Sequence, residues 1–458
     1  MTSTPNETDL AHYATAVRGL LARGGYELSG RPAQAARWEI THVRDYLDAH
    51  GAPDARPTVH VAGSKAKGSI ATMTEALIRA SLPATPGSAR TMLYTSPDLH
   101  AARERITLDG EAIGAATFAT LAGQVLADPG TEGWSYFELL TLMAWQAAAD
   151  AGCRWQVLEV GLGGRLDTTN AIAEKAVAVI APTDLEHTAI LGETIQEIAA
   201  EKAGILTGPC DLVVAPQRAS ALDVIRAAAE AAGARLHEIA AECGLEVTSQ
   251  SLDQLQFDVQ TPERKYRQIK LQLLGQHQAE NALAAIRAAE LALATEEIEL
   301  DEQTVRQALA GVRLPGRGEV IGRQPLTIVD GAHTPLAAKR LRQALDQTGV
   351  PKARVFVFGL LDGKDVEPIA RALFGPDDQA MIAPPASPRA ADTAAVAEVV
   401  RALGVPVSTA PDVATALDRA TITAGERGAV IATGSLRTVA EVREARLVIT
   451  GDRALGLR

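Results

Sequence analysis

The sequence predicts an α/β fold of two domains, each built around a mostly parallel sheet. The chain has 458 residues, more than one hydrophobic core ordinarily holds. Strand-like and helix-like segments alternate along it, which is typical of parallel strands joined by crossover helices. A stretch rich in Gly, Pro and Arg at 311–322 interrupts this alternation, which then restarts. We therefore expect a larger N-terminal domain at 1–312 and a smaller C-terminal domain at 313–458.

The first segment of the N-terminal domain should alternate helices and short buried strands. Residues 35–51 carry apolar side chains near helical spacing at Trp38, Ile40, Val43 and Leu47, and Gly51 can end that helix. Parallel strands are predicted at 58–63, within 155–164, where the strand runs into glycines, and at 176–183. Polar and apolar residues alternate over 245–275, which predicts a small antiparallel patch. The composition of 277–294 strongly favours a helix.

The C-terminal domain repeats the alternation on a smaller scale. Strands are predicted at 325–330, 353–359, 379–384 and 428–434, with helical stretches between them. This pattern indicates a second open α/β sheet of the Rossmann-like kind. In such sheets ligands bind at the carboxyl ends of the strands. Residues directly after the strands of both domains are therefore the candidates for function.

Composition excludes several classes of partner. Lys and Arg number 44 against 56 Asp and Glu, so the net charge is −12 and the chain as a whole does not attract nucleic acid or anionic membrane. The start of the chain lacks the features of a signal peptide, and no apolar run is long enough to span a bilayer. Three separated cysteines, Cys153, Cys210 and Cys243, form no C-x-x-C pair. We expect a cytoplasmic protein that holds any anionic ligand at a local positive site.

Residues 59–70, VHVAGSKAKGSI, have the layout of a phosphate-binding loop between a strand and a helix. The common pattern G-x-x-x-x-G-K-[ST] fails here, because Val61 and Ala66 occupy its glycine positions. Lys67 could still meet phosphate oxygens at the positive end of the helix, with a hydroxyl from Ser64 or Ser69. The alternative is a solvated lysine on an ordinary turn, and this stretch alone leaves both interpretations open.

Charged residues follow the other predicted strands as well. Glu159 ends a strand beside a glycine loop, where it could hold Mg²⁺ or pair as a structural charge with Arg165. His187, and Asp330 with His333, also come directly after strands. A functional role is favoured for Glu159, because a buried unpaired carboxylate is unfavourable, whereas a lone histidine such as His187 is more often structural. Their recurrence at strand ends in both halves nevertheless predicts a cleft between the domains that gathers them.

Several longer stretches carry a more specific signal when they are taken together. Beside HVAGSKAKGS, they are YTSPDLHAARERITLDGEAI (94–113), SYFELLTLMAW (135–145), VLEVGLGGRLDTTNAI (157–172), DLEHTAILGETIQEIAAEKAGIL (184–206), GQHQAENA (275–282), PGRGEV (315–320), DGAHTP (330–335) and TGSLRTVAEVR (433–443). In this unbroken order they resemble the folylpolyglutamate synthase/dihydrofolate synthase family, a branch of the Mur-type ATP-dependent ligases. The resemblance implies a P-loop-type N-terminal domain, with a loop that is a variant of the family's Gly-Thr-x-Gly-Lys-Gly-Ser form.

The resemblance implies an activity and its substrates. ATP would phosphorylate a carboxylate of dihydropteroate or a folate, and the amine of L-glutamate would attack the acyl phosphate, giving an amide, ADP and phosphate. Mg²⁺ is the implied metal, and a monovalent cation such as K⁺ also fits the family. Closure of the two domains would complete the site and exclude water. We expect a monomer whose partners are these small molecules, without nucleic acid or membrane.

The resemblance also assigns roles by position. Nucleotide-binding positions are Gly63, Ser64, Lys65, Lys67, Gly68, Ser69, Asn281, Arg317 and Asp330. Metal-binding positions are Ser96, Glu159 and His187. Catalytic positions are Lys67, Lys202 and His333, and Lys202 matches a lysine that is carbamylated in related enzymes. The folate-side walls would be the loop Ser96–His100 and the stretch Tyr136–Glu138.

Three positions depart from the family pattern, and two other functions remain open. Ala66 replaces a glycine, Asp98 a histidine and Thr334 an asparagine. One alternative is a Mur-type amide ligase that acts on another carboxylate. The other is a non-catalytic nucleotide-binding relative, which Ala66 and Thr334 favour and the retained Lys67, Glu159, His187 and Lys202 oppose.

Overall fold

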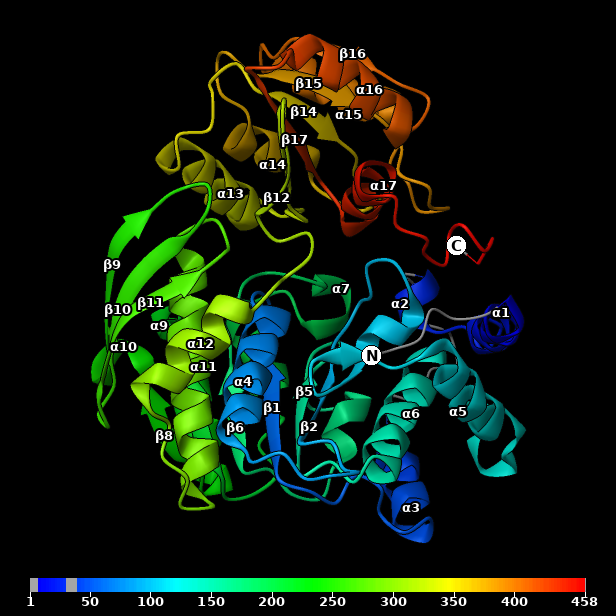
Figure 1. Ribbon diagram of the computed structural model, residues 1–458, viewed down its shortest axis with the longest axis vertical. Helices are drawn as coiled ribbons and strands as arrows, with labels where there is room; N and C mark the ends of the chain where they lie inside the picture. Colours follow the sequence, from blue (N-terminus) through cyan, green and yellow to red (C-terminus); the bar gives the residue numbers. More distant parts are fainter. Residues whose placement is uncertain (1–6, 30–38, 458) are drawn as a thin grey trace.

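The computed structural model describes residues 7–29 and 39–457, and the elements named here belong to that part of the chain. Two α/β lobes follow one another along the long axis of the molecule (Figure 1). Each is built on a mostly parallel sheet, which confirms the predicted fold class. Residues 35–38 of the helix predicted over 35–51, Trp38 included, lie outside the described residues. The described part of that span forms helix α3 (Thr41–Ala49).

The N-terminal sheet has eight strands among the described residues, in the order β4-β3-β2-β5-β1-β6-β7-β8. They are β1 (Thr58–Ala62), β2 (Thr91–Tyr94), β3 (Ile106–Leu108), β4 (Glu111–Ala112), β5 (Trp155–Glu159), β6 (Val177–Ile180), β7 (Asp211–Val214) and β8 (Arg235–Glu238). The strands β2, β5, β1, β6, β7 and β8 are parallel to their neighbours in this order. At one edge, β3 pairs antiparallel with β2 and with β4. Val61 of β1 lies beside both Glu159 of β5 and Val179 of β6, so these three strands end level with one another.

Helices cover both faces of this sheet, and its central strands β1 and β5 are therefore buried along their whole length. On one face lie α4 (Lys67–Ser81), α11 (His277–Ala294) and α12 (Glu302–Gly311). The other face is covered by α1 (Glu7–Leu21), α3, α5 (Ala115–Ala127), α6 (Tyr136–Asp150), α8 (Ile195–Ala203) and α9 (Ala219–Ala232). Shorter turns of helix are α2 (Tyr26–Ser29), α7 (Thr188–Leu191), α10 (Ile239–Glu242), η1 (Ala102–Arg105), η2 (Pro129–Thr131) and η3 (Thr168–Ala171).

The predicted antiparallel patch is a three-stranded sheet that packs on α11. Its strands are β9 (Gly244–Gln250), β10 (Leu255–Gln260) and β11 (Lys265–Leu271), with β10 in the middle. The alternation in the sequence arises because Phe257 and Val259 point into the same core as α11 while their neighbours are half-exposed. Helix α11 itself coincides with the span predicted from helix propensity.

The C-terminal lobe has a six-stranded sheet in the order β12-β13-β17-β14-β15-β16. The strands are β12 (Glu319–Arg323), β13 (Leu326–Val329), β14 (Val355–Phe358), β15 (Gln379–Ile382), β16 (Val407–Thr409) and β17 (Ala429–Thr433). They are parallel except for the pair of β12 and β13. One face packs on α13 (Pro335–Gln347), α14 (Val366–Leu373) and α15 (Thr393–Ala402), the other on α16 (Val413–Ala424) and α17 (Leu436–Leu447).

Each strand named from the sequence is present. In the stretch 155–164, β5 ends at Glu159, where the glycine-rich loop begins as expected. Between the lobes, α12 ends at Gly311 and β12 starts at Glu319, and the boundary at 312/313 stays a prediction within this connection. No helix in the described ranges is long and apolar enough to cross a membrane.

Candidate active site

The phosphate-type loop leaves β1 and is held against the segment that follows β6. Gly63 has φ +151°, and a Cβ there would lie 2.6 Å from the Cβ of Ala181, so the two segments are in close contact. The amides of Ser64 and Lys65 both donate to the carbonyl of Pro182, at 3.0 and 3.2 Å. The Ser64 hydroxyl donates to the carbonyl of Asp184 at 2.9 Å. These bonds hold the loop on top of two neighbouring strands.

Ala66 turns the chain into helix α4. Its φ and ψ are +67° and −2°, a left-handed conformation that is unfavourable for alanine by about 1–2 kcal/mol. Lys67 is the first residue of α4, so its backbone lies at the positive end of the helix. Gly68 faces Glu159, because a Cβ at Gly68 would lie 3.2 Å from Glu159 Oε2. Ser69 is buried in the same first turn.

Glu159 is a nearly buried carboxylate at the end of β5, and 5% of its surface is exposed. Its Oε2 accepts the backbone N–H of Ser96 at 3.0 Å. Burial raises the pKa of Glu159, while the nearby charges of Lys67 and Arg317 act in the opposite direction. A buried carboxylate such as Glu159 is a suitable oxygen ligand for a divalent cation. No group of three His, Cys, Asp or Glu side chains gathers as metal ligands in the described residues, and the predicted set has two, with Ser96 as a third ligand of another kind.

Glu186 joins two lysines of the site. Its Oε1 lies 2.9 Å from Lys202 Nζ, and its Oε2 lies 3.5 Å from Lys65 Nζ. Burial alone would raise the pKa of Glu186, but Lys202, Lys67 and Lys65 outweigh it and lower the pKa to about 2. Glu186 is therefore a carboxylate at any working pH. It fixes the position of both amines relative to the phosphate-type loop.

Two groups next to Glu186 have pKa values that bear on chemistry. Lys202, in the last turn of α8, is 1% exposed, and burial lowers its pKa to about 8 against the opposing charge of Glu186. His187 has φ +47° and precedes α7. Burial lowers the pKa of His187 to about 4, although Glu186 opposes the shift. At neutral pH His187 is therefore an uncharged imidazole, the form that binds metals.

The C-terminal lobe presents a second set of groups from the ends of its own strands. Asp330, directly after β13, accepts the N–H groups of Gly318 and Ala332 at 2.8 and 2.9 Å, and burial raises its pKa. The Nδ1 of His333 donates to the carbonyl of Gly331 at 2.7 Å. Burial, followed by the charge of Lys65 in the other lobe, lowers the pKa of His333 to about 3.

Charges of the two lobes influence each other directly. The charge of Arg317 acts to lower the pKa of both Glu159 and Asp330. The charge of Lys364, in the loop after β14, acts to lower the pKa of His187 and of His333. In turn, Lys65 acts to lower the pKa of Lys364 and Glu186 acts to raise it. The site therefore lies between the lobes, where the predicted cleft was expected.

The structure gathers most of the predicted residues. The prediction depended on Lys67 lying near Glu159 and His187. The charge of Lys67 acts on the pKa of both groups, lowering it in each case. Asn281 is the exception, because its amide donates to Gln278 of the same helix at 3.0 Å and not to a charged group of the site within the described residues. Glu186 and Lys364 were missed. Both follow parallel strands, so the rule that found Glu159 and Asp330 could have found them too.

Two of the departures from the family pattern have local explanations. Asp98 is buried and accepts from Arg105 Nε at 2.7 Å, so it neutralises a fully buried guanidinium. Arg105 also pairs with Glu27 and lies 5.2 Å above the ring of Tyr136. Thr334 caps α13, its hydroxyl accepting the N–H of Ala337 at 3.4 Å. Threonine can serve in place of asparagine at a cap, and these two residues keep the fold around the site.

Comparison with known proteins identifies the class first. The Mur ligase middle domain matches residues 61–289, and the Mur ligase glutamate ligase domain matches residues 316–436. The two lobes and the site between them are thus those of a Mur-type ligase. A Mycobacterium tuberculosis protein, dihydrofolate synthase/folylpolyglutamate synthase, is 34% identical over 379 residues, which cover 78% of this chain and 76% of that protein. The chain belongs to the folylpolyglutamate synthase/dihydrofolate synthase family of ATP-dependent ligases.

Solved structures agree with this assignment over nearly the whole chain. Folylpolyglutamate synthase of M. tuberculosis, complexed with ADP, superposes with a TM-score of 0.83 at 31% identity, covering 95% of this chain and 98% of that one. An Escherichia coli relative in complex with DHPP and ADP gives 0.78 at 26% identity, covering 96% and 98%. A bifunctional relative with Mn, AMPPNP and L-glutamate bound gives 0.77 at 29% identity, covering 90% and 95%.

Proposed function

We propose that this protein adds L-glutamate to dihydropteroate, to folates or to both, through an acyl phosphate formed with ATP. One observation carries the proposal. Cationic side chains from both lobes converge on the phosphate-type loop beside the buried Glu159, namely Lys65, Lys67, Lys202, Arg317 and Lys364. Phosphoryl transfer moves negative charge between oxygens, and fixed positive charge stabilises it. The bound ligands of the relatives support the same substrates.

The nucleotide would lie across the cleft. Lys67 and the N–H groups of the loop from Gly63 to Ser69 would hold its phosphates, since Lys67 lies at the start of α4. Lys65, held by Glu186, would add charge beside them. Asn281, Arg317 and Asp330 would contact the rest of the nucleotide from α11 and the C-terminal lobe.

Ser96, Glu159 and His187 would hold the metal, for which we propose Mg²⁺. The donor set fits, because Glu159 is a buried carboxylate facing cations and His187 is uncharged at neutral pH. When bound, the metal would neutralise phosphate charge during transfer. Glu159 holds the Ser96 loop in place in either case, through its bond to the Ser96 N–H. A monovalent cation such as K⁺ is part of the same proposal.

Lys202 and His333 would act near the reacting atoms. The pKa of Lys202 near 8 leaves about a tenth of its amine uncharged at pH 7, the form that CO₂ carbamylates. A carbamate would turn this lysine into an anion beside the metal position. His333 donates through Nδ1 to Gly331, which leaves Nε2 as an acceptor for a proton or a polar group.

The acid substrate would enter along the Ser96–His100 loop and the Tyr136–Glu138 stretch. Tyr136 is buried, and Glu138 closes the capping box of α6 with Ser135. Phe137 is half-buried and its ring lies close to Gly161, where a Cβ would meet it at 2.5 Å. We propose that this ring is the part of the stretch that packs on the pterin. We further expect a cytoplasmic monomer.

The test is phosphate release from Mg-ATP with L-glutamate, using dihydropteroate and tetrahydrofolate side by side. Release that requires both the acid and glutamate supports the ligase, and the two acids separate the first addition from chain extension. Nucleotide binding without turnover would instead favour the non-catalytic relative. Lys67→Ala should abolish release and leave the melting temperature near that of the parent, because Lys67 is half-exposed.

A further inference from the structure

The end of the described chain leaves the C-terminal lobe and returns to the N-terminal one. After α17, residues 448–457 run toward α1, as the red segment of Figure 1 shows. Leu457 is 7% exposed and belongs to the same apolar cluster as Tyr13 and Phe118. We name residues 448–457 the C-terminal strap. It joins the lobes a second time, apart from the connection at 312–318.

Asp452 is the anchor of the strap, and 1% of its surface is exposed. Its backbone N–H donates to the carbonyl of His100 at 2.8 Å. Its carboxylate accepts the N–H of Ala102 at 2.9 Å and the hydroxyl of Tyr13 at 2.8 Å. One residue from the far end of the sequence therefore fixes the loop after β2 and helix α1 together.

The neighbouring residue leaves no space between strap and loop. A Cβ added to Gly451 would lie 2.7 Å from the carbonyl oxygen of His100 and 3.2 Å from its Cβ. The nearest obstacle is backbone, which cannot swing aside as a long side chain can. The strap and the loop thus pack as closely as the absence of a side chain at Gly451 permits.

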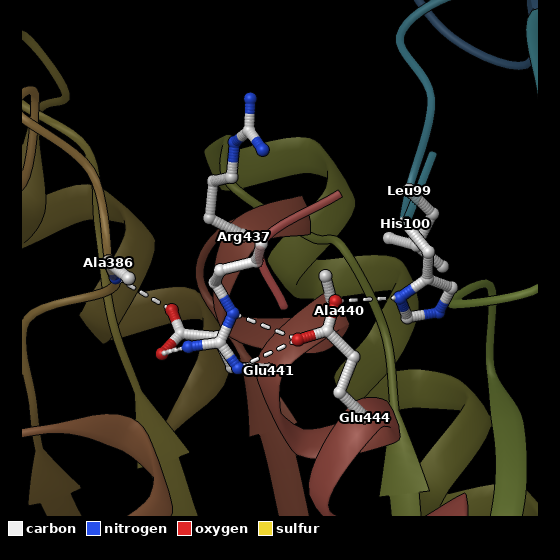
Figure 2. A pocket seen from close by; sticks show the side chains of 8 residues that line it. Leu99, His100, Ala386, Arg437, Ala440, Glu441 and Glu444 are labelled. Atoms are coloured by element: carbon white, nitrogen blue, oxygen red, sulfur yellow. Dashed lines mark hydrogen bonds and ion pairs between the residues drawn. The ribbon is translucent and has the colours of Figure 1, made fainter. Parts of the chain in front are cut away.

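The turn that starts the strap is strained, which indicates that its anchors impose it. Val448 has φ +55° and ψ +47° and is 89% exposed. A β-branched residue adopts this conformation rarely and at a cost in free energy. Beside it, Glu444 of α17 contacts His100 Nδ1 at 3.1 Å and accepts from Arg453 Nε at 2.9 Å (Figure 2). Strap and helix hold His100 from two sides.

The loop that the strap holds reaches the centre of the site. Its Ser96 N–H donates to Glu159 at 3.0 Å, and its His100 N–H donates to Glu104 at 3.1 Å. We propose that the C-terminal strap positions this loop for the pterin-bearing acid, with Asp452 as the positioning residue. Asp452 acts through His100 and Ala102 and does not itself touch substrate. The inference rests on the proposed function, in which this loop is the folate-side wall.

The decisive variant is Gly451→Ala, which keeps every hydrogen-bonding group and adds one methyl group. Ala454→Ser is the matched control, because it adds one atom to an exposed residue of the same turn. We expect Gly451→Ala to raise the KM for dihydropteroate or folate about tenfold, since displacements near 1 Å change rates by up to about a hundredfold. The KM values for ATP and L-glutamate should stay within about twofold. Equal KM values for the acid in both variants would overturn the proposal, as would a parallel rise for all three substrates.

A second measurement does not depend on turnover. Hydrogen–deuterium exchange in residues 95–105 should be faster in Asp452→Ala than in the parent. Asp452→Asn keeps one acceptor and should restore part of the protection. In Tyr13→Phe the bonds to His100 and Ala102 remain, so exchange in the loop should not change. Unaltered exchange in Asp452→Ala would refute the strap, whereas a parent without ligase activity but with strap-dependent exchange would refute the proposed function alone.

Discussion

Glu159 lies at the end of β5 in the candidate site, where burial disfavours its charged form. Its carboxylate is nearly enclosed, and burial raises its pKa above the ordinary value of 4.5. The folded protein without metal therefore binds a proton more readily than the unfolded chain does, and Glu159 reduces stability as the pH rises above about 4.5. Such trade-offs between stability and activity are common in active sites.

We accordingly expect Glu159→Gln to be more stable than the parent by about 1 kcal/mol at neutral pH without metal. The gain should vanish below pH 4.5, where the parent carboxyl is protonated in both states. The same variant should lose most of its activity and its response to magnesium. Urea unfolding at pH 7 and at pH 4, with a magnesium titration of phosphate release, checks both halves. An unchanged magnesium titration would remove Glu159 from the metal site.

Lys202 supports a prediction about dissolved CO₂. Its pKa near 8 means that the uncharged, nucleophilic amine increases steeply between pH 6.5 and pH 8.5. Enzyme depleted of CO₂ should regain activity faster at the higher pH when the CO₂ concentration is held fixed. Lys202→Arg should remain inactive and insensitive to CO₂. Activity that ignores CO₂ depletion at both pH values would exclude a carbamate.

At the level of elements, the phosphate-type loop is strained at one residue. Ala66→Gly removes a methyl group from a left-handed backbone. It should raise stability by about 0.5–1 kcal/mol, because the relief of strain exceeds the added freedom of the unfolded chain. Ala227→Gly on the exposed side of α9 is the matched control and should lower stability by about 1 kcal/mol. Thermal unfolding of both variants tests the opposite signs, and a loss of stability in both would contradict the strain at Ala66.

The sequence predicted most of the strands and helices that carry the site, but it did not reveal every side chain that they bring together. Buried strands such as β1 and β5 and the helix α11 were found, because their apolar or helix-favouring composition is continuous. Glu186 was missed because its importance comes from two lysines, Lys65 and Lys202, that are distant in sequence. The structural role of Asp98 likewise depends on its pairing with the buried Arg105.

On the scale of the whole molecule, nucleotide binding should draw on both lobes at once. A non-hydrolysable ATP analogue with a divalent metal, at about 100 times its Kd, should stabilise the protein by about 2.7 kcal/mol. Arg317→Ala removes a cation of the C-terminal lobe that acts on Glu159, and it should cut this stabilisation substantially.

The control for this whole-molecule effect is Arg323→Ala. Arg323 lies in the same lobe, is exposed, and pairs with Asp253 of the turn between β9 and β10. Its removal should leave the ligand-induced rise in melting temperature unchanged. Equal rises in Arg317→Ala and in the parent would show that the nucleotide is held by the N-terminal lobe alone.

The position of β1 in its sheet has one more consequence. It lies between β5 and β6, with further strands outside both, whereas β4 and β8 form the margins. Sheets open from their margins inward, because an outer strand has a neighbour on one side alone. A molecule that has frayed at β8 would still carry an intact nucleotide cradle. In mild denaturant, proteases should therefore trim the outer strands well before binding is lost.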